Sequence, residues 1–561
     1  MNKAGVFQAG LLLAVVWLLV RPFGAYLERV FERKKTSLDP LLLPVERLIH
    51  RTLGVDPKSE MTGKRYSLAF ALFGIGNVAF MDVALRWQTA LPWFFPQQMT
   101  TPMTVDLAAN TAVSFATTTT WQAYGGETTM SYLSQLLLAG QNFLAGAAGL
   151  AVGVAFIRGY VCERTDKLGN FWGDLVRALL WVLLPMSILG SLILIALGVP
   201  MNFLSYVQAH AIEGGTQIIA QGPVAALEFI KNLGTNGGGF FNVNAAHPFE
   251  NPNGLTNFIE LLAIIIVPAA LTHTFGRMVR RPRDGWVIFW TMTALFIAGL
   301  IVCNLAESTI ASRDLVGGNI EGKEVRFGVN GAALAAAVTS NGATGSYNSM
   351  HDSFQPLGAL VPLVNMLLGE IIYGGLGTGL ISMIFVALIA LFIGGLMIGR
   401  TPEHLGKKIG VPEMKIIAFY TLVSPAVILT LTAVAVVTKP GLAGLTTNAG
   451  AHGFTEILFA YASAFANNGQ NMAGLSANNL FYNITTIIAM IAGRFTLSIL
   501  ALVLAGRFAS MSHRPRNAGT MPSDGFPFGV LLATTSILLG ALNFLPAVAL
   551  GPLVEHFNLH W

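Results

Sequence analysis

Long apolar runs dominate the pattern of hydrophobic and polar residues along this chain. Ten of them reach about 20 residues or more, the length that an α-helix needs to cross the hydrocarbon core of a bilayer. The runs cover residues 5–27, 66–88, 131–156, 171–197, 257–277, 284–306, 364–398, 412–438, 480–506 and 526–552. Membrane-spanning β-strands would instead alternate over segments of about ten residues. The pattern therefore predicts an all-α polytopic membrane protein with about ten transmembrane helices.

The composition excludes the large soluble classes of protein. Only 11% of the 561 residues are charged and 53% are hydrophobic, whereas soluble domains average about 25% charged residues. A water-soluble fold of this length would lack the polar groups to cover its surface. A cytosolic enzyme, a disordered scaffold and a collagen-like fibre are thereby ruled out. The two cysteines, Cys162 and Cys303, are too few for a disulfide framework or a four-cysteine zinc site.

The basic residues alternate in density between successive loops, which predicts the orientation. Most of the 33 Lys and Arg residues fall within 29–65, 158–167, 277–283, 400–415 and 507–516. Loops rich in Lys and Arg stay on the cytoplasmic side. The opposite loops hold only Lys3, Lys231, Arg313, Lys323, Arg326 and Lys439. We therefore expect both termini to lie outside.

Four loops on the sparsely charged side are long and share one layout. Loops 89–130, 198–256, 307–363 and 439–479 each carry an apolar or small-residue stretch that is too short to cross, which is typical of a re-entrant segment. Small, hydroxyl and amide residues follow each stretch: Thr117, Thr118, Thr119, Thr120; Asn236, Gly237, Gly238; Thr344, Gly345, Ser346; Asn467, Asn468, Gly469. Irregular backbone at membrane depth is tolerated only where it is buried in protein or lines water.

This layout divides the chain into four copies of span, short helix, loop and span. With Thr118, Gly237, Gly345 and Gly469 as markers, the loops recur at similar intervals. We expect one integral membrane domain over 1–561, with repeats at 66–156, 171–277, 284–398 and 412–506 and extra spans at 1–30 and 526–561. Four such loops around one central pore form the pattern of a cation filter.

The residue types in these loops favour potassium. Glycine lets backbone carbonyls turn inward and threonine adds a hydroxyl oxygen, and such oxygens can replace the hydration shell of potassium. Calcium or magnesium would want carboxylates, and the loop cores contain none. Two plainer interpretations stay open: the threonines could bond back to their own helix, and the glycines could serve close helix packing.

Several segments resemble the KdpA family, the potassium-translocating subunits of bacterial Kdp ATPases, and the resemblance covers essentially the whole chain. The matching segments are 110–124, 232–242, 348–353, 369–379, 464–475 and 493–495. The resemblance implies a potassium selectivity filter at the four loops, with Gln122 supporting the first, in the bacterial inner membrane. It also implies a separate P-type ATPase subunit, KdpB, with KdpC and KdpF, and ions that leave sideways toward KdpB.

One departure from the family concerns the first loop, where members often carry Asn at the positions of Thr118 and Thr120. If backbone carbonyls coordinate the ion, this change is harmless. If side chains coordinate it, the potassium affinity is altered.

No motif in the chain indicates ATP hydrolysis. It has no phosphate-binding loop that ends in Gly-Lys-Ser/Thr. The segment 166–170 lacks the threonines of a P-type phosphorylation motif, and its loop is too short for a nucleotide domain. We expect a non-catalytic subunit that binds the potassium ion but no nucleotide, contacts membrane lipid, and has no nucleic-acid partner.

The seventh run is too long for one straight crossing. Four glycines interrupt it: Gly374, Gly375, Gly377 and Gly379. Broken helices place a flexible segment near mid-membrane, so this segment is either a gate below the filter or a packing kink. Arg494, near the middle of the ninth run, could repel ions from an inner exit, pair with Glu370, or extend to the inner face. We interpret Asp352 as support for the third loop.

Two other functions remain open on the sequence. A passive potassium channel or symporter of the same superfamily would share the filter but would not hold an ATPase subunit. A secondary transporter for an organic solute would usually show inverted repeats, whereas each repeat here starts from the same side.

Overall fold

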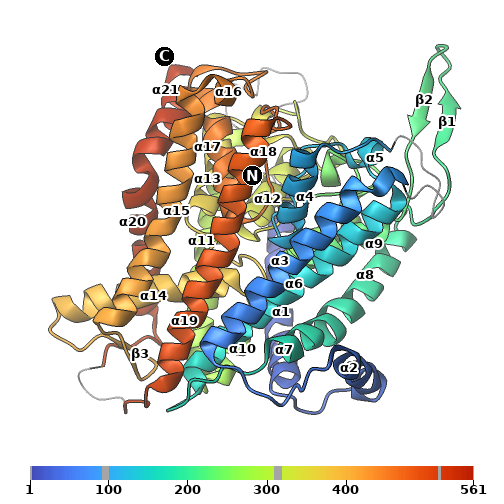
Figure 1. The fold of residues 1–561 in the computed structure, drawn as a ribbon. Helices are drawn as coiled ribbons and strands as arrows, with labels where there is room; N and C mark the ends of the chain where they lie inside the picture. The colour runs from blue at the N-terminus through green and yellow to red at the C-terminus, as the bar shows by residue number, and fades with distance from the viewer. Residues whose placement is uncertain (1–2, 91–99, 309–318, 516–519, 560–561) are drawn as a thin grey trace.

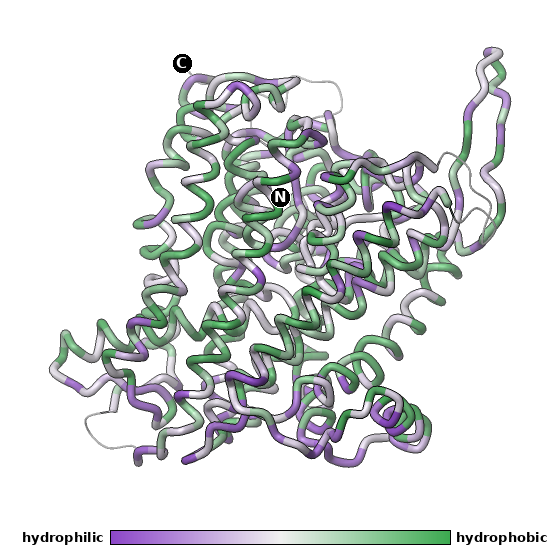
Figure 2. Tube along the Cα trace, viewed as in Figure 1, coloured by the Kyte–Doolittle hydropathy of each residue, from purple (hydrophilic) through white to green (hydrophobic). Residues whose placement is uncertain are grey.

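The computed structural model describes residues 3–90, 100–308, 319–515 and 520–559. Among these residues, ten helical segments are long and apolar enough to cross a membrane, which confirms the predicted number. They form a bundle with both termini in the upper half of the view, as an even number of crossings requires (Figure 1). Hydrophobic residues follow the long helices, while hydrophilic residues gather toward the two ends of the bundle (Figure 2).

Three of the ten spans are built from consecutive helical segments that include one π-helical turn. The spans are α1 (Lys3–Phe31), α3 (Gly63–Arg86), α6 (Tyr132–Val161), α7–η2–α8 (Phe171–Arg177, Ala178–Leu183, Leu184–Ala196), α10 (Gly254–Met278), α11 (Pro282–Glu307), α14 (Thr378–Met397), α15 (Val411–Val437), α18–η6–α19 (Leu480–Ile491, Ala492–Thr496, Leu497–Ser510) and α20–η7–α21 (Phe526–Val548, Ala549–Leu553, Val554–Leu559).

The seventh span differs from the prediction, because 364–398 is not one interrupted crossing. Helix α13 (Pro356–Leu367) ends well before α14 begins at Thr378. Between them the backbone takes positive φ at Gly369, Glu370, Tyr373, Gly375 and Gly377. This left-handed conformation cannot continue a right-handed helix. Only α14 is a candidate span, and it runs at a steep angle to α15 and α19 in the lower part of the bundle (Figure 1).

Four shorter helices lie in the long loops, as the short apolar stretches predict. They are α4 (Val105–Ala116), α9 (Val224–Leu233), α12 (Gly328–Asn341) and α17 (Gly450–Ala466), and each ends directly before its small or amide residues. We call them the pore helices. The order of span, pore helix, loop and span thus occurs four times along the chain.

The remaining elements are short or lie at the periphery. They are α2 (Asp39–Leu53), η1 (Gln88–Ala90), α5 (Gly126–Thr129), β1 (Val207–His210), β2 (Thr216–Ile219), η3 (Asn244–Ala246), η5 (His351–Ser353), β3 (Glu403–His404), β4 (Lys407–Lys408) and α16 (Lys439–Leu442). Strands β1 and β2 pair antiparallel, Val207 opposite Ile219, and this hairpin projects beyond the bundle (Figure 1).

The spans differ in how much of their surface the protein itself covers. The apolar window of α6 is 83% buried, whereas those of α1 and α3 are 22% buried. Glycines make α6 suitable for the interior: Gly146 contacts the backbone of Gly234, Gly149 that of Leu376, and Gly153 that of Gly377. Small residues on one helix face allow such close approach in membranes. The interior of the bundle is therefore the place where the loops meet.

Candidate functional site

The four loops that follow the pore helices share one backbone conformation. In each loop, two residues with positive φ flank one residue with negative φ. The pairs are Thr118 (65°) and Thr120 (47°), Thr235 (51°) and Gly237 (84°), Ala343 (52°) and Gly345 (73°), and Asn467 (60°) and Gly469 (70°). Alternating handedness points successive N–H groups to one side of the chain and leaves the carbonyls to the other. The loops are therefore structurally equivalent.

This equivalence corrects the marker chosen for the first loop. Thr120, and not Thr118, corresponds to Gly237, Gly345 and Gly469. Four consecutive threonines carry no signal of position, because the same residue type occupies every place in the loop.

The loops touch one another in a closed ring. A Cβ atom added at Gly237 would overlap the carbonyl oxygen of Thr344, and one added at Gly345 would overlap that of Asn468. One added at Gly469 would overlap the carbonyl oxygen of Thr119 in the first loop. The Thr120 hydroxyl closes the ring by donating a hydrogen bond to the carbonyl oxygen of Asn236. These glycines thus meet two demands, a positive φ and a close approach of backbones.

The side chains of the first loop divide between two roles. Thr117 bonds back to its own helix, with its Oγ1 donating to the carbonyl oxygen of Val113 at 2.8 Å, in agreement with the plainer interpretation. The next three threonines lie in the loop, and Thr119 Oγ1 accepts from Asn467 Nδ2 at 3.0 Å. Helix back-bonding therefore explains Thr117 and not its neighbours.

The amide side chains of Gln122 and Asn468 form hydrogen bonds that hold the loops of the ring. Gln122 donates from Nε2 to the carbonyl oxygen of Gly239 at 3.1 Å and accepts the Gly239 N–H at 2.9 Å. Asn468 accepts the Gln470 N–H at 2.9 Å and donates from Nδ2 to Glu370 at 3.0 Å. Gly238, with φ 70°, lies beside Gln122, and Ser346 is buried next to Gly345. The predicted filter residues thus lie together.

A cavity of about 120 Å³ adjoins the ring. One residue from each loop lines it: Thr118, Thr235, Ala343 and Asn467. These are the first left-handed residues of the four loops, so the cavity lies on the axis that the loops surround. It extends away from that axis to residues of α14, α15 and α20, among them Phe385, Ser424 and Asn543.

The predicted gate residues belong to the segment between α13 and α14. The Gly375 N–H donates to the carbonyl oxygen of Gly342 at 3.3 Å, and the Leu376 N–H donates to Thr235 Oγ1 at 3.2 Å. The segment is thus tied to the second and third loops, and Gly375 lines the cavity.

The other three glycines of this segment are explained by packing. Gly377 contacts α6 at Gly149 and Gly153. Gly379 donates its N–H to the carbonyl oxygen of Gly374 at 2.6 Å. Packing therefore accounts for these glycines, and the gate stays a prediction.

Arg494 and Glu370 line the same cavity but do not pair. Arg494 is 5% exposed and donates from Nη2 to the carbonyl oxygen of Ala145 at 2.8 Å. Glu370 accepts the bond from Asn468. Within the described part of the chain, no ion pair joins Arg494 and Glu370, and Arg494 does not extend to the inner face. That Arg494 repels ions from an inner exit stays a prediction.

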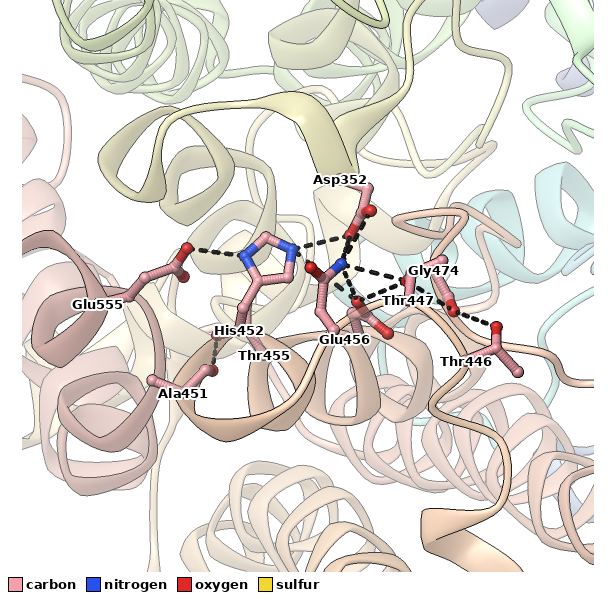
Figure 3. A network of polar contacts seen from close by, with 10 residues as sticks. Asp352, Thr446, Thr447, Ala451, His452, Thr455, Glu456, Gly474 and Glu555 are labelled. Carbon is pink, nitrogen blue, oxygen red and sulfur yellow. Dashed lines mark hydrogen bonds and ion pairs between the residues drawn. The ribbon is translucent and has the colours of Figure 1, made fainter. Parts of the chain in front are cut away.

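Asp352 belongs to a polar network that includes His452, Glu456 and Glu555 (Figure 3). Its carboxylate accepts from Asn448 Nδ2 at 3.1 Å and from His452 Nε2 at 2.8 Å, and its N–H donates to the carbonyl oxygen of Met472 at 2.9 Å. His452 contacts Glu555 through Nδ1 at 2.7 Å. Asp352 thus connects the end of the third loop to the fourth repeat and to α21.

Burial alone would lower the pKa of His452, but its hydrogen bonds to Asp352 and Glu555 raise it to about 10. One ligand atom each of Asp352, His452 and Glu456 lies within 4.8 Å of the others, close enough for a metal ion. Asn448 Nδ2 already donates to both carboxylates there. Internal ion pairs and hydrogen bonds account for this network.

Sequence comparison decides the family. The family model of the potassium-transporting ATPase A subunit, KdpA, matches residues 10–557. The chain belongs to the KdpA family. A relative from Methylorubrum extorquens is 50% identical over 99% of this chain and 98% of its own length. A relative from Granulibacter bethesdensis is also 50% identical, over 100% of this chain and 99% of its own length. Both are named as the potassium-binding subunit of a potassium-transporting ATPase.

A solved structure shares the fold at low sequence identity. The crystal structure of the potassium transporter TrkH from Vibrio parahaemolyticus superposes with a TM-score of 0.53 and 12% identity, covering 87% of this chain and 98% of TrkH. The likeness to TrkH concerns the fold, and in this KdpA-family chain the order of span, pore helix, loop and span occurs four times, with the four loops in one ring.

Several residues of the site escaped the sequence prediction. Thr235 and Ala343 line the cavity, and Gly239 pairs with Gln122. Lys231 and Lys323, which the sequence assigns to the outer loops, are 0% and 6% exposed. The signal for Lys231 was its place, with Glu228, in the apolar stretch before Gly234, where a buried charge needs a partner.

Proposed function

We propose that this chain selects and binds extracellular potassium and passes it to an associated P-type ATPase subunit, which drives uptake with ATP. The observation that carries the proposal is the closed ring of four equivalent loops. Their left-handed pairs and glycine contacts bring the backbones of four distant segments onto one axis. The names of the relatives, potassium-binding subunits of a potassium-transporting ATPase, support the same function.

The proposed filter coordinates the ion with oxygen atoms of the ring. Its residues are Thr117, Thr118, Thr119, Thr120, Asn236, Gly237, Gly238, Thr344, Gly345, Ser346, Asn467, Asn468 and Gly469, with Gln122 and Asp352 in support. Carbonyl oxygens suit a weakly hydrated monovalent cation. The absence of Asp and Glu from segments 117–120, 234–239, 342–346 and 467–470 disfavours calcium and magnesium.

In this proposal the ion leaves the filter through the cavity and moves sideways. The cavity extends toward α14, α15 and α20. The buried guanidinium of Arg494 lies in its wall and repels a cation from a direct inner exit. The segment from Gly374 to Gly379, together with Glu370, forms the gate. The receiving subunit is KdpB, assembled with KdpC and KdpF, and this chain binds no nucleotide.

The proposed location is the bacterial cytoplasmic membrane, with both termini outside. The basic loops would then face the cytoplasm, as the distribution of Lys and Arg favours. The pore helices and the ring would face the outside, where potassium is collected.

The test is the ATPase activity of the co-expressed, purified complex as a function of potassium, rubidium and sodium. In Gly237→Ala and Gly345→Ala, we expect a higher half-saturating potassium concentration and weaker discrimination against sodium. Gly76→Ala is the matched control, since Gly76 lies on α3 with no atom within 4 Å of an added Cβ. Unchanged ion preference in both ring variants would refute the proposed filter. Failure of the chain to hold an ATPase subunit would favour a passive channel instead.

A further inference from the structure

A buried charge cluster lies directly behind the second loop. Lys231, in the last turn of pore helix α9, is fully buried. Its Nζ lies 2.6 Å from Glu228 Oε2 and 2.6 Å from Glu250 Oε2. Both carboxylates are buried as well. Such charges are expensive to bury unless they are paired, and Lys231 supplies the pairing for both.

Glu250 joins this cluster to the outer end of the second loop. Its second oxygen, Oε1, accepts the Phe241 N–H at 2.8 Å. It also lies against the backbone of Gly239, where an added Cβ would come within 2.6 Å of Oε1. One carboxylate therefore bridges the ammonium group of Lys231 and the main chain of the loop.

Lys231 also holds the inner end of the same loop. Its carbonyl oxygen accepts the Asn236 N–H at 2.9 Å. The segment 236–241 is thus fastened at both ends to one residue, at its start through the Lys231 carbonyl and at its end through the Lys231 side chain and Glu250. Gly237 and Gly238 lie between these two attachments.

Stability alone is a weak reason for this arrangement. Apolar residues of similar volume can often replace a buried ion pair without loss of stability. What a charge-assisted pair adds is a short, directed contact that fixes the atoms it joins. Here that contact ends on the backbone of a loop whose carbonyls must hold their positions to within a fraction of an ångström.

We propose that Glu250 and Lys231 are positioning residues that hold the second loop in its ion-binding geometry and thereby set potassium affinity and discrimination. The inference rests on the proposed function of the ring as a filter. Neither residue contacts the ion. Glu250 acts through the N–H of Phe241, and the Lys231 side chain acts through Glu250.

The central variant is Glu250→Gln, which keeps the shape and the acceptor for Phe241 but removes the charge that pairs with Lys231. Glu307→Gln is the matched control. Glu307 is also fully buried and pairs with a buried lysine, Lys323, at 2.9 Å, but it bonds to Asn319 and Gln355 and not to a loop of the ring.

The measurement is the potassium dependence of ATPase activity in the purified complex, with rubidium and sodium in parallel. In Glu250→Gln we expect the half-saturating potassium concentration to rise about tenfold, the size expected when one hydrogen bond to a charged group is lost. The maximal rate should change less than about twofold, because ion capture and not turnover is impaired. Glu307→Gln should keep both values.

Wild-type half-saturation and ion preference in Glu250→Gln would overturn the inference. Glu250→Asp keeps the negative charge, but its side chain is one methylene shorter, so the carboxylate lies farther from Lys231 and Phe241. This variant should weaken potassium binding as well. Loss of assembly in both Glu250 variants, with assembly retained in Glu307→Gln, would also overturn it, because the pair would then serve the fold and not the ion. If Gly345→Ala alters ion preference and Glu250→Gln does not, the positioning role of Glu250 and Lys231 is refuted while the proposed filter stands. If neither variant alters ion preference, the proposed filter is refuted as well.

Discussion

Thr120 offers a direct test of whether backbone or side-chain oxygens bind the ion. It occupies the position that glycine holds in the other three loops, with φ 47° and 1% exposure. Its hydroxyl donates to the carbonyl oxygen of Asn236 in the next loop. Thr120→Gly would make the first loop like the other three, and it would remove only the side chain with its hydroxyl and methyl groups.

The expected change in stability is small, because the contributions oppose one another. The left-handed conformation costs a non-glycine residue about 1–2 kcal/mol, which glycine would recover. Against this gain, glycine loses about 0.5–1 kcal/mol more backbone entropy on folding, and the lost hydrogen bond contributes about 0.5–1.5 kcal/mol. The net effect therefore lies between about 1 kcal/mol of stabilisation and about 1.5 kcal/mol of destabilisation.

The assay is potassium-stimulated ATPase activity of the purified complex, with rubidium and sodium for comparison. If the carbonyls coordinate the ion, Thr120→Gly should keep its half-saturating potassium concentration within about threefold of the wild type. The counterpart is Gly469→Ala, which adds left-handed strain and a Cβ that overlaps the carbonyl oxygen of Thr119. It should weaken potassium binding. A tenfold or greater loss of affinity in Thr120→Gly would refute the reasoning, since the hydroxyl oxygen would then be a ligand.

Three further predictions concern the cavity and the outer network. Arg494→Ala should lower the ratio of potassium uptake to ATP hydrolysis in proteoliposomes, and an unchanged ratio would contradict the role of Arg494. Gly375→Val should reduce potassium uptake without loss of the complex, and loss of assembly would contradict the role of Gly375 in the gate. The pKa of His452, about 10 when folded against 6.5 when unfolded, gives a stabilisation that is complete below pH 6.5 and lost as the pH rises toward 10. Thermal unfolding between these pH values should show this loss, and His452→Gln should flatten the dependence; equal slopes in both proteins would count against the ion pair with Asp352.

The sequence by itself determined the number of spans and the presence of the pore helices, but not where the seventh span begins. Lipid allows no unpaired backbone groups, so apolar length alone identifies helices that cross. The four shorter helices followed from the same rule, because stretches such as 456–466 are apolar but too short to span. The small and amide residues behind them marked the loops of the ring.

Only the tertiary structure decided which residues of those loops are equivalent and what holds them. Thr120 and Ala343 have a left-handed φ that their residue types do not signal. Lys231 pairs with Glu228 of its own helix and also with Glu250, which the chain reaches only after the loop has turned back on its pore helix. Local sequence encodes length and polarity, whereas the contact of Gly237 with Thr344 depends on how distant segments pack.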